Sequence, residues 1–296
     1  MKKEIRIVRE ILASLPDDSN KSLEEQRNGM NELMAAMPPP EGTLIEAVEA
    51  DGIPAEWVSF DGAAKNRVIY YLHGGGYVMG SPATHRRMVA LIGRAAGAAV
   101  LSLDYRLAPE HPYPAAVEDA TAGYRWLLRQ DIHPGGIAIA GDSAGGGLAA
   151  ATLVSLRDAG DPLPACGVFI SPWADMTCSS ETYDTERETD PFVVQNVIKE
   201  MADCYLNGAN PKTPLASPVF ADLAELPPLL IQVGSEEVLL GDALALEGRA
   251  RAAGVDCTLE VWPDMIHVWH FFSEMLLDAR KAINRVGEFC KIHQNP

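Results

Sequence analysis

The sequence predicts an α/β fold in which a mostly parallel sheet is covered by helices on both faces. Eight short runs rich in β-branched and other apolar residues alternate with stretches of helical periodicity, a pattern typical of parallel sheets. The chain has 296 residues, of which 47% are hydrophobic, so it is long enough for one large domain with a sizeable core. A glycine-rich turn at residues 141–147 joins one of these strands to a helix.

Each expected strand is bounded by turn residues or by an expected helix. The strands are expected at residues 46–49, 55–60, 67–72, 98–105, 135–143, 166–171, 228–234 and 257–262. The helices between and after them are expected at residues 88–96, 114–129, 148–157, 242–253 and 272–290. Because sites in such sheets lie at the carboxyl ends of the strands, the loops that follow the strands are where catalytic residues are expected.

Two segments depart from this alternation. Residues 1–37 carry apolar side chains at helical spacing before any strand begins. Residues 173–226 contain one expected helix, at 193–205, and are too long to be a simple loop between neighbouring strands. We interpret both as pieces of a helical cap on a single structural domain. The boundaries predicted are 1–45 for the N-terminal cap helices, 46–172 and 227–296 for the core, and 173–226 for the second cap segment.

Composition and charge exclude several classes of protein. The formal charge of -17 argues against nucleic acid and anionic membrane surfaces as partners. No apolar run reaches the length of a membrane span, and charged residues interrupt the N-terminal segment where a signal peptide would be apolar. The five cysteines are widely spaced and form no C-x-x-C pair, which argues against a zinc site or a disulfide framework. We therefore expect a cytoplasmic protein that acts on a small molecule.

The Gly-Asp-Ser-Ala-Gly segment at residues 141–145 matches G-x-S-x-G, the nucleophile elbow. An alternating Ile and Ala strand precedes it and an Ala- and Leu-rich helix follows, which is the context the motif requires. Ser143 would then present its hydroxyl at a helix N-terminus, where the helix dipole favours negative charge. The alternative is a glycine-rich turn with a surface serine. Asp142 is expected to stabilise the elbow or the cap rather than to react.

A serine hydroxyl needs a base, and in sheets with this elbow the order along the chain is serine, acid, histidine. His267 lies in the loop after the last expected strand, where a base would face the carboxyl edge of the sheet. His270 is the alternative base and could begin the last helix. His293 lies near the end of the chain and is expected to be solvated.

Three carboxylates in the loop after residue 234 could orient this base. Glu237 is favoured because it lies a few residues past the strand, where its side chain can turn toward the loop of His267. Asp242 resembles an N-cap or first-turn residue of the next helix, and Glu236 could be solvated. The acid would hold the imidazole tautomer and stabilise the imidazolium, without itself gaining the proton.

A glycine run directly after the strand 67–72 predicts an oxyanion hole. Its members are His73, Gly74, Gly75 and Gly76. The N–H groups of Gly75 and Gly76 could point into one pocket together with that of Ala144, and His73 would brace the loop through a backbone bond. Glycine-rich loops also bind phosphate. The combination with an elbow and a late histidine favours an oxyanion.

These motifs resemble the hormone-sensitive-lipase-like branch of the α/β-hydrolases, the bacterial family IV carboxylesterases, over nearly the whole chain. The residues that carry the resemblance are His73-Gly74-Gly75-Gly76-Tyr77, Asp104-Tyr105-Arg106-Leu107-Ala108-Pro109-Glu110, Gly141-Asp142-Ser143-Ala144-Gly145-Gly146 and Met265-Ile266-His267. The resemblance implies the α/β-hydrolase fold with an eight-stranded sheet, a two-piece cap, activity on short-acyl esters, and no metal or cofactor. It implies a homodimer by analogy. The family's usual D-P-L segment is here Glu237-Val238-Leu239, with Glu in place of Asp.

Together these features predict a serine carboxylic ester hydrolase for short- to medium-chain esters, with Ser143, His267 and Glu237 as a triad. A lactone hydrolase or acetyl-hydrolase on the same scaffold is the alternative. A non-catalytic binding protein of this fold is more remote, because the serine and histidine are both present. Aromatic residues that could line the ester pocket are Tyr77, Trp173, Phe192, Tyr205 and Trp269.

Overall fold

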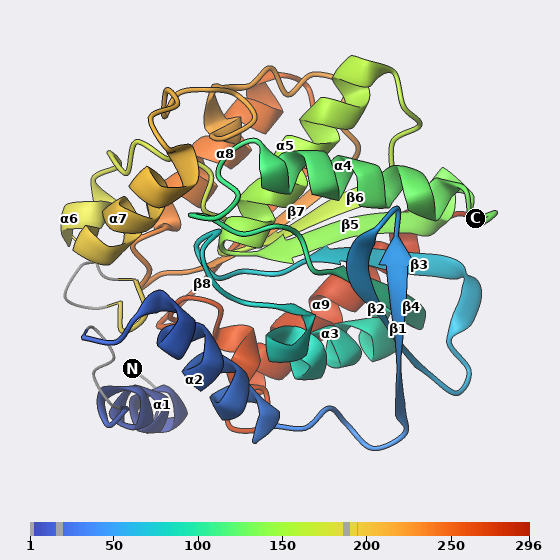
Figure 1. Cartoon of the computed structure of the whole chain (residues 1–296). Coiled ribbons are helices and arrows are strands. Elements are labelled where there is room, and N and C mark those ends of the chain that lie inside the picture. Colours follow the sequence, from blue (N-terminus) through green and yellow to red (C-terminus); the bar gives the residue numbers. More distant parts are fainter. Residues whose placement is uncertain (1–2, 16–19, 186–189, 194) are drawn as a thin grey trace.

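The computed structural model describes residues 3–15, 20–185, 190–193 and 195–296. Its eight-stranded sheet has the order β1-β2-β4-β3-β5-β6-β7-β8 (Figure 1). The strands are β1 (Thr43–Ala50), β2 (Ile53–Phe60), β3 (Ala64–Leu72), β4 (Ala98–Leu103), β5 (Ile137–Asp142), β6 (Cys166–Ile170), β7 (Leu229–Gly234) and β8 (Cys257–Trp262). β2 runs antiparallel to both of its neighbours, β1 and β4, and β4, β3, β5, β6, β7 and β8 are parallel to one another. The predicted mostly parallel sheet is confirmed.

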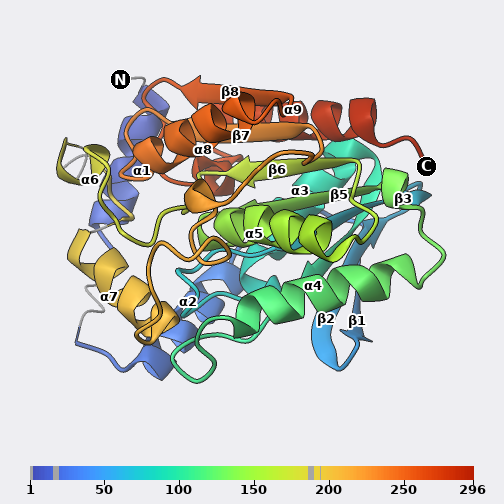
Figure 2. The same ribbon diagram turned by 90° about the horizontal axis from the view of Figure 1, so that it is seen from above.

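Helices cover both faces of the sheet, as expected for parallel strands joined by helical crossovers. α3 and α9 pack on one face, and α4, α5 and α8 pack on the other (Figures 1 and 2). The helices are α1 (Lys3–Ala13), α2 (Leu23–Ala35), α3 (Pro82–Ala96), α4 (Ala115–Leu128), α5 (Ala144–Ala159), α6 (Thr182–Thr185), α7 (Gln195–Leu206), α8 (Leu240–Ala252) and α9 (Leu277–His293). Short 3-10 turns are η1 (Pro134–Gly136), η2 (Pro218–Phe220) and η3 (Trp269–Phe272).

The central strand β5 shows how the sequence pattern produces this layering. Successive side chains of a strand point to opposite faces. Ile137 and Ile139 accordingly join the core beneath α4, α5 and α8, whereas Ala138 and Ala140 join the core beneath α3 and α9. Every residue of β5 is buried, which explains why the strand is apolar up to its last residue, Asp142, rather than alternating with polar residues.

α3, α5 and α9 begin four to six residues from their predicted starts, whereas α4, α7 and α8 begin within two residues of theirs. α3 begins at Pro82 instead of residue 88, because Ser81 and Thr84 form a reciprocal capping box that starts the helix earlier. α5 begins at Ala144, directly after the elbow, instead of residue 148, so the glycine run is helical. α9 begins at Leu277 instead of residue 272, because Trp269–Phe272 forms the 3-10 turn η3.

α2 and α7 lie beyond the carboxyl ends of the strands, on the left in Figure 1. Arg27 of α2 ties that helix to the loops after β3 and β4, since its guanidinium donates to the Val78 carbonyl at 2.7 Å and to the Ala108 carbonyl at 2.9 Å. The same guanidinium pairs with Glu110 at 2.8 Å. No helix among residues 3–15, 20–185, 190–193 and 195–296 has the length and apolar character that crossing a bilayer requires.

Gly145 permits the close approach of α5 to β3. A Cβ atom at this position would lie 2.0 Å from the Leu72 carbonyl oxygen and 2.4 Å from the His73 carbonyl oxygen. Both neighbours are backbone atoms, which cannot move aside as a side chain can.

We therefore expect Gly145→Ala to lower the free energy of unfolding by about 3 kcal/mol or more, as overpacking does in a rigid core. Gly248→Ala is the matched control, because Gly248 lies inside α8 with nothing within 4 Å of its Cβ position. The control should raise stability by about 0.5–1 kcal/mol. Urea unfolding of both variants measures this, and equal effects would contradict the packing argument.

Candidate active site

Ser143 stands at the end of β5 in a strained backbone conformation, with φ 53° and ψ −122°. Its amide donates to the Ile170 carbonyl at 2.9 Å, and its carbonyl accepts from the Trp173 amide at 2.9 Å. A non-glycine residue keeps such angles only when its surroundings hold it there. These two bonds fasten the serine to β6 and to the segment after it, and α5 begins at the next residue.

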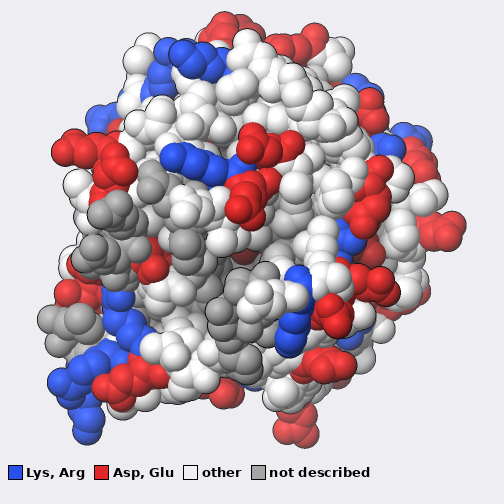
Figure 3. All heavy atoms as spheres, turned by 60° about the vertical axis from the view of Figure 1, so that its left-hand side comes forward, with Lys and Arg blue, Asp and Glu red and all other residues white. Residues whose placement is uncertain are grey.

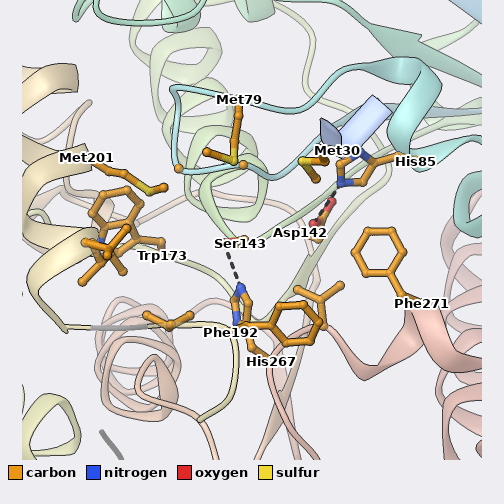
Figure 4. A pocket seen from close by; sticks show the side chains of 16 residues that line it. Met30, Met79, His85, Asp142, Ser143, Trp173, Phe192, Met201, His267 and Phe271 are labelled. Carbon is orange, nitrogen blue, oxygen red and sulfur yellow. Dashed lines mark hydrogen bonds and ion pairs between the residues drawn. The ribbon is translucent and has the colours of Figure 1, made fainter. Parts of the chain in front are cut away.

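His267 reaches Ser143 from the loop after β8. Its Nε2 lies 3.0 Å from the Ser143 Oγ (Figure 4), and its Nδ1 lies 3.1 Å from Oε2 of Glu237. Loops that follow β5, β7 and β8 thus place a hydroxyl, an imidazole and a carboxylate in one hydrogen-bonded row. Their order along the chain, serine, glutamate, histidine, is the one the elbow requires.

Glu237 is fully buried and is held by groups other than the histidine. Its Oε1 accepts from the Gly234 amide at 2.7 Å and from the Ser171 hydroxyl at 2.7 Å. The Ser171 hydroxyl in turn accepts from the Val268 amide at 3.2 Å, which connects the loop of Glu237 to the loop of His267. Sequence reasoning missed Ser171. The available signal was its place directly after a buried strand, at the same sheet edge as Ser143.

Burial and charge act in opposite directions on this pair. Burial alone would lower the pKa of His267, but the hydrogen bond and the charge of Glu237 outweigh it and raise the pKa above 6.5. Burial raises the pKa of Glu237, and the hydrogen bond from His267 opposes that rise. The carboxylate therefore favours the imidazolium that forms when the base takes a proton.

The structure gives the alternative acids other roles. Asp242, in the first turn of α8, accepts from the amides of Ala174 and Asp175 at 3.0 and 2.9 Å. Burial raises its pKa to about 8. It is not the N-cap residue, because that position is occupied by Leu239. Glu236 keeps 32% of its side chain exposed and lies 3.9 Å from Arg9.

The alternative histidines lie away from Ser143. His270 is in the 3-10 turn η3, not at the start of the last helix. It is fully buried, its Nε2 lies 2.9 Å from the Gln232 side chain, and burial lowers its pKa to about 3. His293 was expected beyond the last helix and solvated, but it is the final residue of α9, is half-buried, and lies 4.4 Å from the ring of Phe289.

The glycine loop after β3 lines the pocket beside Ser143. Gly75 and Gly76 have φ of 118° and 63°, which L side chains rarely adopt. Within the described part of the chain, their N–H groups make no hydrogen bond, and that of Ala144 has no partner inside its helix. His73 donates from Nδ1 to the Gly74 carbonyl at 2.8 Å, which is the backbone bond expected of it.

Asp142 braces this loop from behind. Its Oδ1 accepts from the Tyr71 hydroxyl at 2.7 Å and the Gly74 amide at 3.1 Å, and its Oδ2 lies 3.3 Å from Nε2 of His85 (Figure 4). Burial would raise the pKa of Asp142, but His85 and Tyr71 hold it below its usual value. Sequence reasoning missed His85 and Tyr71, since no motif relates them to residue 142.

A pocket of about 200 Å³ opens over Ser143. Its apolar wall includes Met30 from α2, Met79 from the glycine loop and Met201 from α7 (Figure 4). Met201 lies directly on the loop, because a Cβ atom on Gly76 would be 2.3 Å from its sulfur. On the face that carries these helices, acidic and basic side chains are interspersed rather than gathered into one patch (Figure 3).

Only two of the predicted aromatic residues line this pocket, Trp173 and Phe192. Tyr77 and Tyr205 do not, because their rings stack on each other at 3.8 Å and are buried behind the pocket wall. Trp269 is also absent from the lining, since it packs in a separate core with Ile5 and Val8 of α1.

Comparison with known proteins identifies the family of this chain. A sequence-family model described as an alpha/beta hydrolase fold matches residues 69–271. The chain belongs to the α/β-hydrolase family. The acetyl-hydrolase of Streptomyces hygroscopicus is 46% identical to this α/β-hydrolase over 97% of the chain and 96% of its own length.

Two solved structures resemble this α/β-hydrolase over nearly its whole length. A crystal structure of an esterase/lipase from an uncultured bacterium superposes with a TM-score of 0.95, at 51% identity over 99% of both chains. An esterase from the bacterial hormone-sensitive lipase (HSL) family superposes with a TM-score of 0.96, at 48% identity over 100% of this chain and 99% of the other. The α/β-hydrolase is a member of the hormone-sensitive-lipase-like branch, as its motifs predicted, and it is a carboxylesterase.

The buried carboxyl of Asp242 predicts a pH-dependent stability. In the folded α/β-hydrolase its pKa is raised to about 8, whereas the unfolded chain releases the proton near 3.8. The contribution of this carboxyl to the free energy of unfolding is greatest below its pKa in the unfolded chain. It is lost as the pH rises toward about 8, the pKa in the folded state.

Asp242→Asn should therefore gain stability relative to the parent enzyme between pH 5 and pH 8, since the amide cannot ionise and can still accept from the two amides. Urea unfolding at both pH values measures the difference. Asp222→Asn is the control, because the Asp222 carboxylate caps the Ala224 amide at an exposed site. A parallel pH dependence for parent and Asp242→Asn would count against the argument.

Proposed function

We propose that this carboxylesterase hydrolyses short- to medium-chain carboxylic esters through Ser143, His267 and Glu237. The observation that carries the proposal is the unbroken row of hydrogen bonds from the Ser143 Oγ through both nitrogens of His267 to the buried Glu237. We further propose that the N–H groups of Gly75, Gly76 and Ala144 form the oxyanion hole.

In this mechanism His267 Nε2 takes the Ser143 proton while Oγ bonds to the ester carbonyl carbon. The carbonyl oxygen becomes an oxyanion, and the proposed hole offers it N–H donors that the protein leaves unused in the described residues. Collapse of this intermediate breaks the bond to the alkoxy oxygen, which leaves with the proton from His267. Water, deprotonated by His267, then attacks the acyl-enzyme and releases the acid and the serine.

The size and lining of the pocket support small ester substrates. Its volume of about 200 Å³ is below the range of roughly 300–1,000 Å³ common for drug-sized ligands. The lining is mostly apolar, which suits a neutral acyl or alkyl chain. A relative 46% identical is an acetyl-hydrolase, which supports acetyl esters as members of the substrate class.

We propose that residues 1–42 and 173–226 act as the two pieces of a cap on a core of residues 43–172 and 227–296, because β1 of the sheet begins at Thr43 rather than after residue 45. Met30 from the first piece, and Phe192 and Met201 from the second, line the pocket over Ser143. A cap of this kind would limit the length of the chains that can enter. Location in the cytoplasm and assembly as a homodimer stay predictions.

Ser143→Ala tests the function directly. We expect the variant to lose about 10⁵-fold or more in kcat on p-nitrophenyl acetate, butyrate and octanoate, because the nucleophile is removed. The parent enzyme should turn over the acetate and butyrate faster than a dodecanoate. Retention of turnover by the variant would overturn the proposed nucleophile, and faster turnover of a lactone panel than of any ester would favour the lactonase alternative.

Glu237→Gln tests the assignment of the acid through pH. The base acts only when neutral, so kcat/KM should fall as the pH drops below the raised pKa of His267. Removing the Glu237 charge lowers that pKa, so the acid limb of the profile should move to lower pH while kcat falls roughly 10³- to 10⁴-fold. Near-parental activity in Glu237→Gln with loss in Asp242→Asn would transfer the role to Asp242.

A further inference from the structure

Asp190 links the second cap segment to the loop of the proposed acid. One carboxylate oxygen accepts from the amides of Phe192 and Val193 at 2.9 and 3.0 Å. The other accepts from the amide of Val238, the residue after Glu237, at 3.0 Å. Asp190 is 5% exposed, so these bonds lie inside the protein.

The three amides belong to two different parts of the site. Phe192 and Val193 line the substrate pocket, whereas Val238 follows the proposed catalytic acid along the chain. Thr182 of α6 reinforces the connection, since its hydroxyl donates to the Val238 carbonyl at 2.6 Å and accepts from the Gly241 amide at 3.0 Å. The wall of the pocket and the loop of the acid are therefore joined through buried polar bonds.

A carboxylate suits this position better than any neutral side chain. It is an acceptor at both oxygens, so it can serve three N–H donors that converge from two sides. An asparagine would offer one oxygen to two of them and turn its own N–H₂ group toward the third. This requirement separates Asp190 from an ordinary turn residue, which accepts only from the amides that follow it.

We propose that Asp190 is a positioning residue that sets the substrate pocket and the catalytic base together. It holds Phe192 and Val193 against the pocket while fixing the loop on which Glu237 orients His267. The position of the pocket wall and the basicity of the imidazole are then linked through one carboxylate. This inference rests on the proposed function, because it assigns Glu237 and His267 their catalytic roles.

Because Asp190 is charged, its removal should change the pKa of His267 and with it the pH dependence of activity. The charged groups that act on His267 are Glu237 and Asp190 from the surrounding loops and Asp142 from β5, while His267 itself acts on His270 of η3. Burial lowers the pKa of His267, whereas the hydrogen bond and the charge of Glu237 raise it. The charge of Asp190 raises this pKa further. Burial is the main cause of the raised pKa of Glu237, and the charge of Asp190 adds to that rise.

The test compares Asp190→Asn and Asp190→Ser with the parent enzyme on p-nitrophenyl butyrate. Both variants remove the charge, so the acid limb of kcat/KM should move to lower pH in both. KM should rise roughly fivefold to tenfold, because both variants lose the Val238 bond, so the pocket wall is no longer tied to the loop of Glu237. Active-site titration with a phosphonate normalises the rates to folded enzyme, so the pH limb can be read even if one variant folds poorly.

Asp175→Asn is the matched control. Asp175 is half-buried in the same cap segment and caps the Thr177 amide at 2.8 Å, but it is not among the groups that act on His267. The acid limb of the kcat/KM profile of Asp175→Asn should lie at the same pH as that of the parent enzyme. If the limb and KM of both Asp190 variants match the parent, the positioning role is overturned. Activity surviving in Ser143→Ala would instead overturn the proposed function, so the two failures are distinguishable.

Discussion

The site depends on a single strained residue being held in place. Ser143 has φ 53°, and its amide and carbonyl are both bonded to the segment that begins at the end of β6. Packing completes the constraint, because Gly145 lets the first turn of α5 lie against the backbone of β3. With the backbone so fixed, the hydroxyl stands at the sheet edge where the loops after β7 and β8 also end.

Buried carboxylates surround His267, and they are stabilised mainly by uncharged donors. Glu237 is bonded to an amide and a hydroxyl besides His267, and Asp190 to three amides. Asp142 is bonded to an amide, a hydroxyl and His85. This arrangement keeps negative charge close to His267 in a setting of low polarity. The field favours an imidazolium, so it lowers the energy of the state in which the proposed base holds the serine proton.

The parts of the site that could be predicted are those tied to strand ends. Ser143 directly follows a parallel strand, and Glu237 and His267 each follow one by a short loop, so the alternation of strands and helices was enough to bring them to one edge. The direction of side chains was not predictable in the same way. Tyr77 was expected in the pocket, but its φ of 62° and its stacking on Tyr205 turn it into the core.

The sequence by itself determined the sheet, the elbow and the loops that would carry the chemistry, because hydrophobic periodicity and glycine-rich turns are local properties. It left Glu237 and Asp242 as rival acids, five residues apart on the same loop and helix start. Only the tertiary structure determined which partner each carboxylate has. Glu237 lies against His267, and Asp242 accepts from the amides of Ala174 and Asp175. The reason is that a buried carboxylate bonds to whichever donors the rest of the fold brings to it, and those donors are distant in sequence.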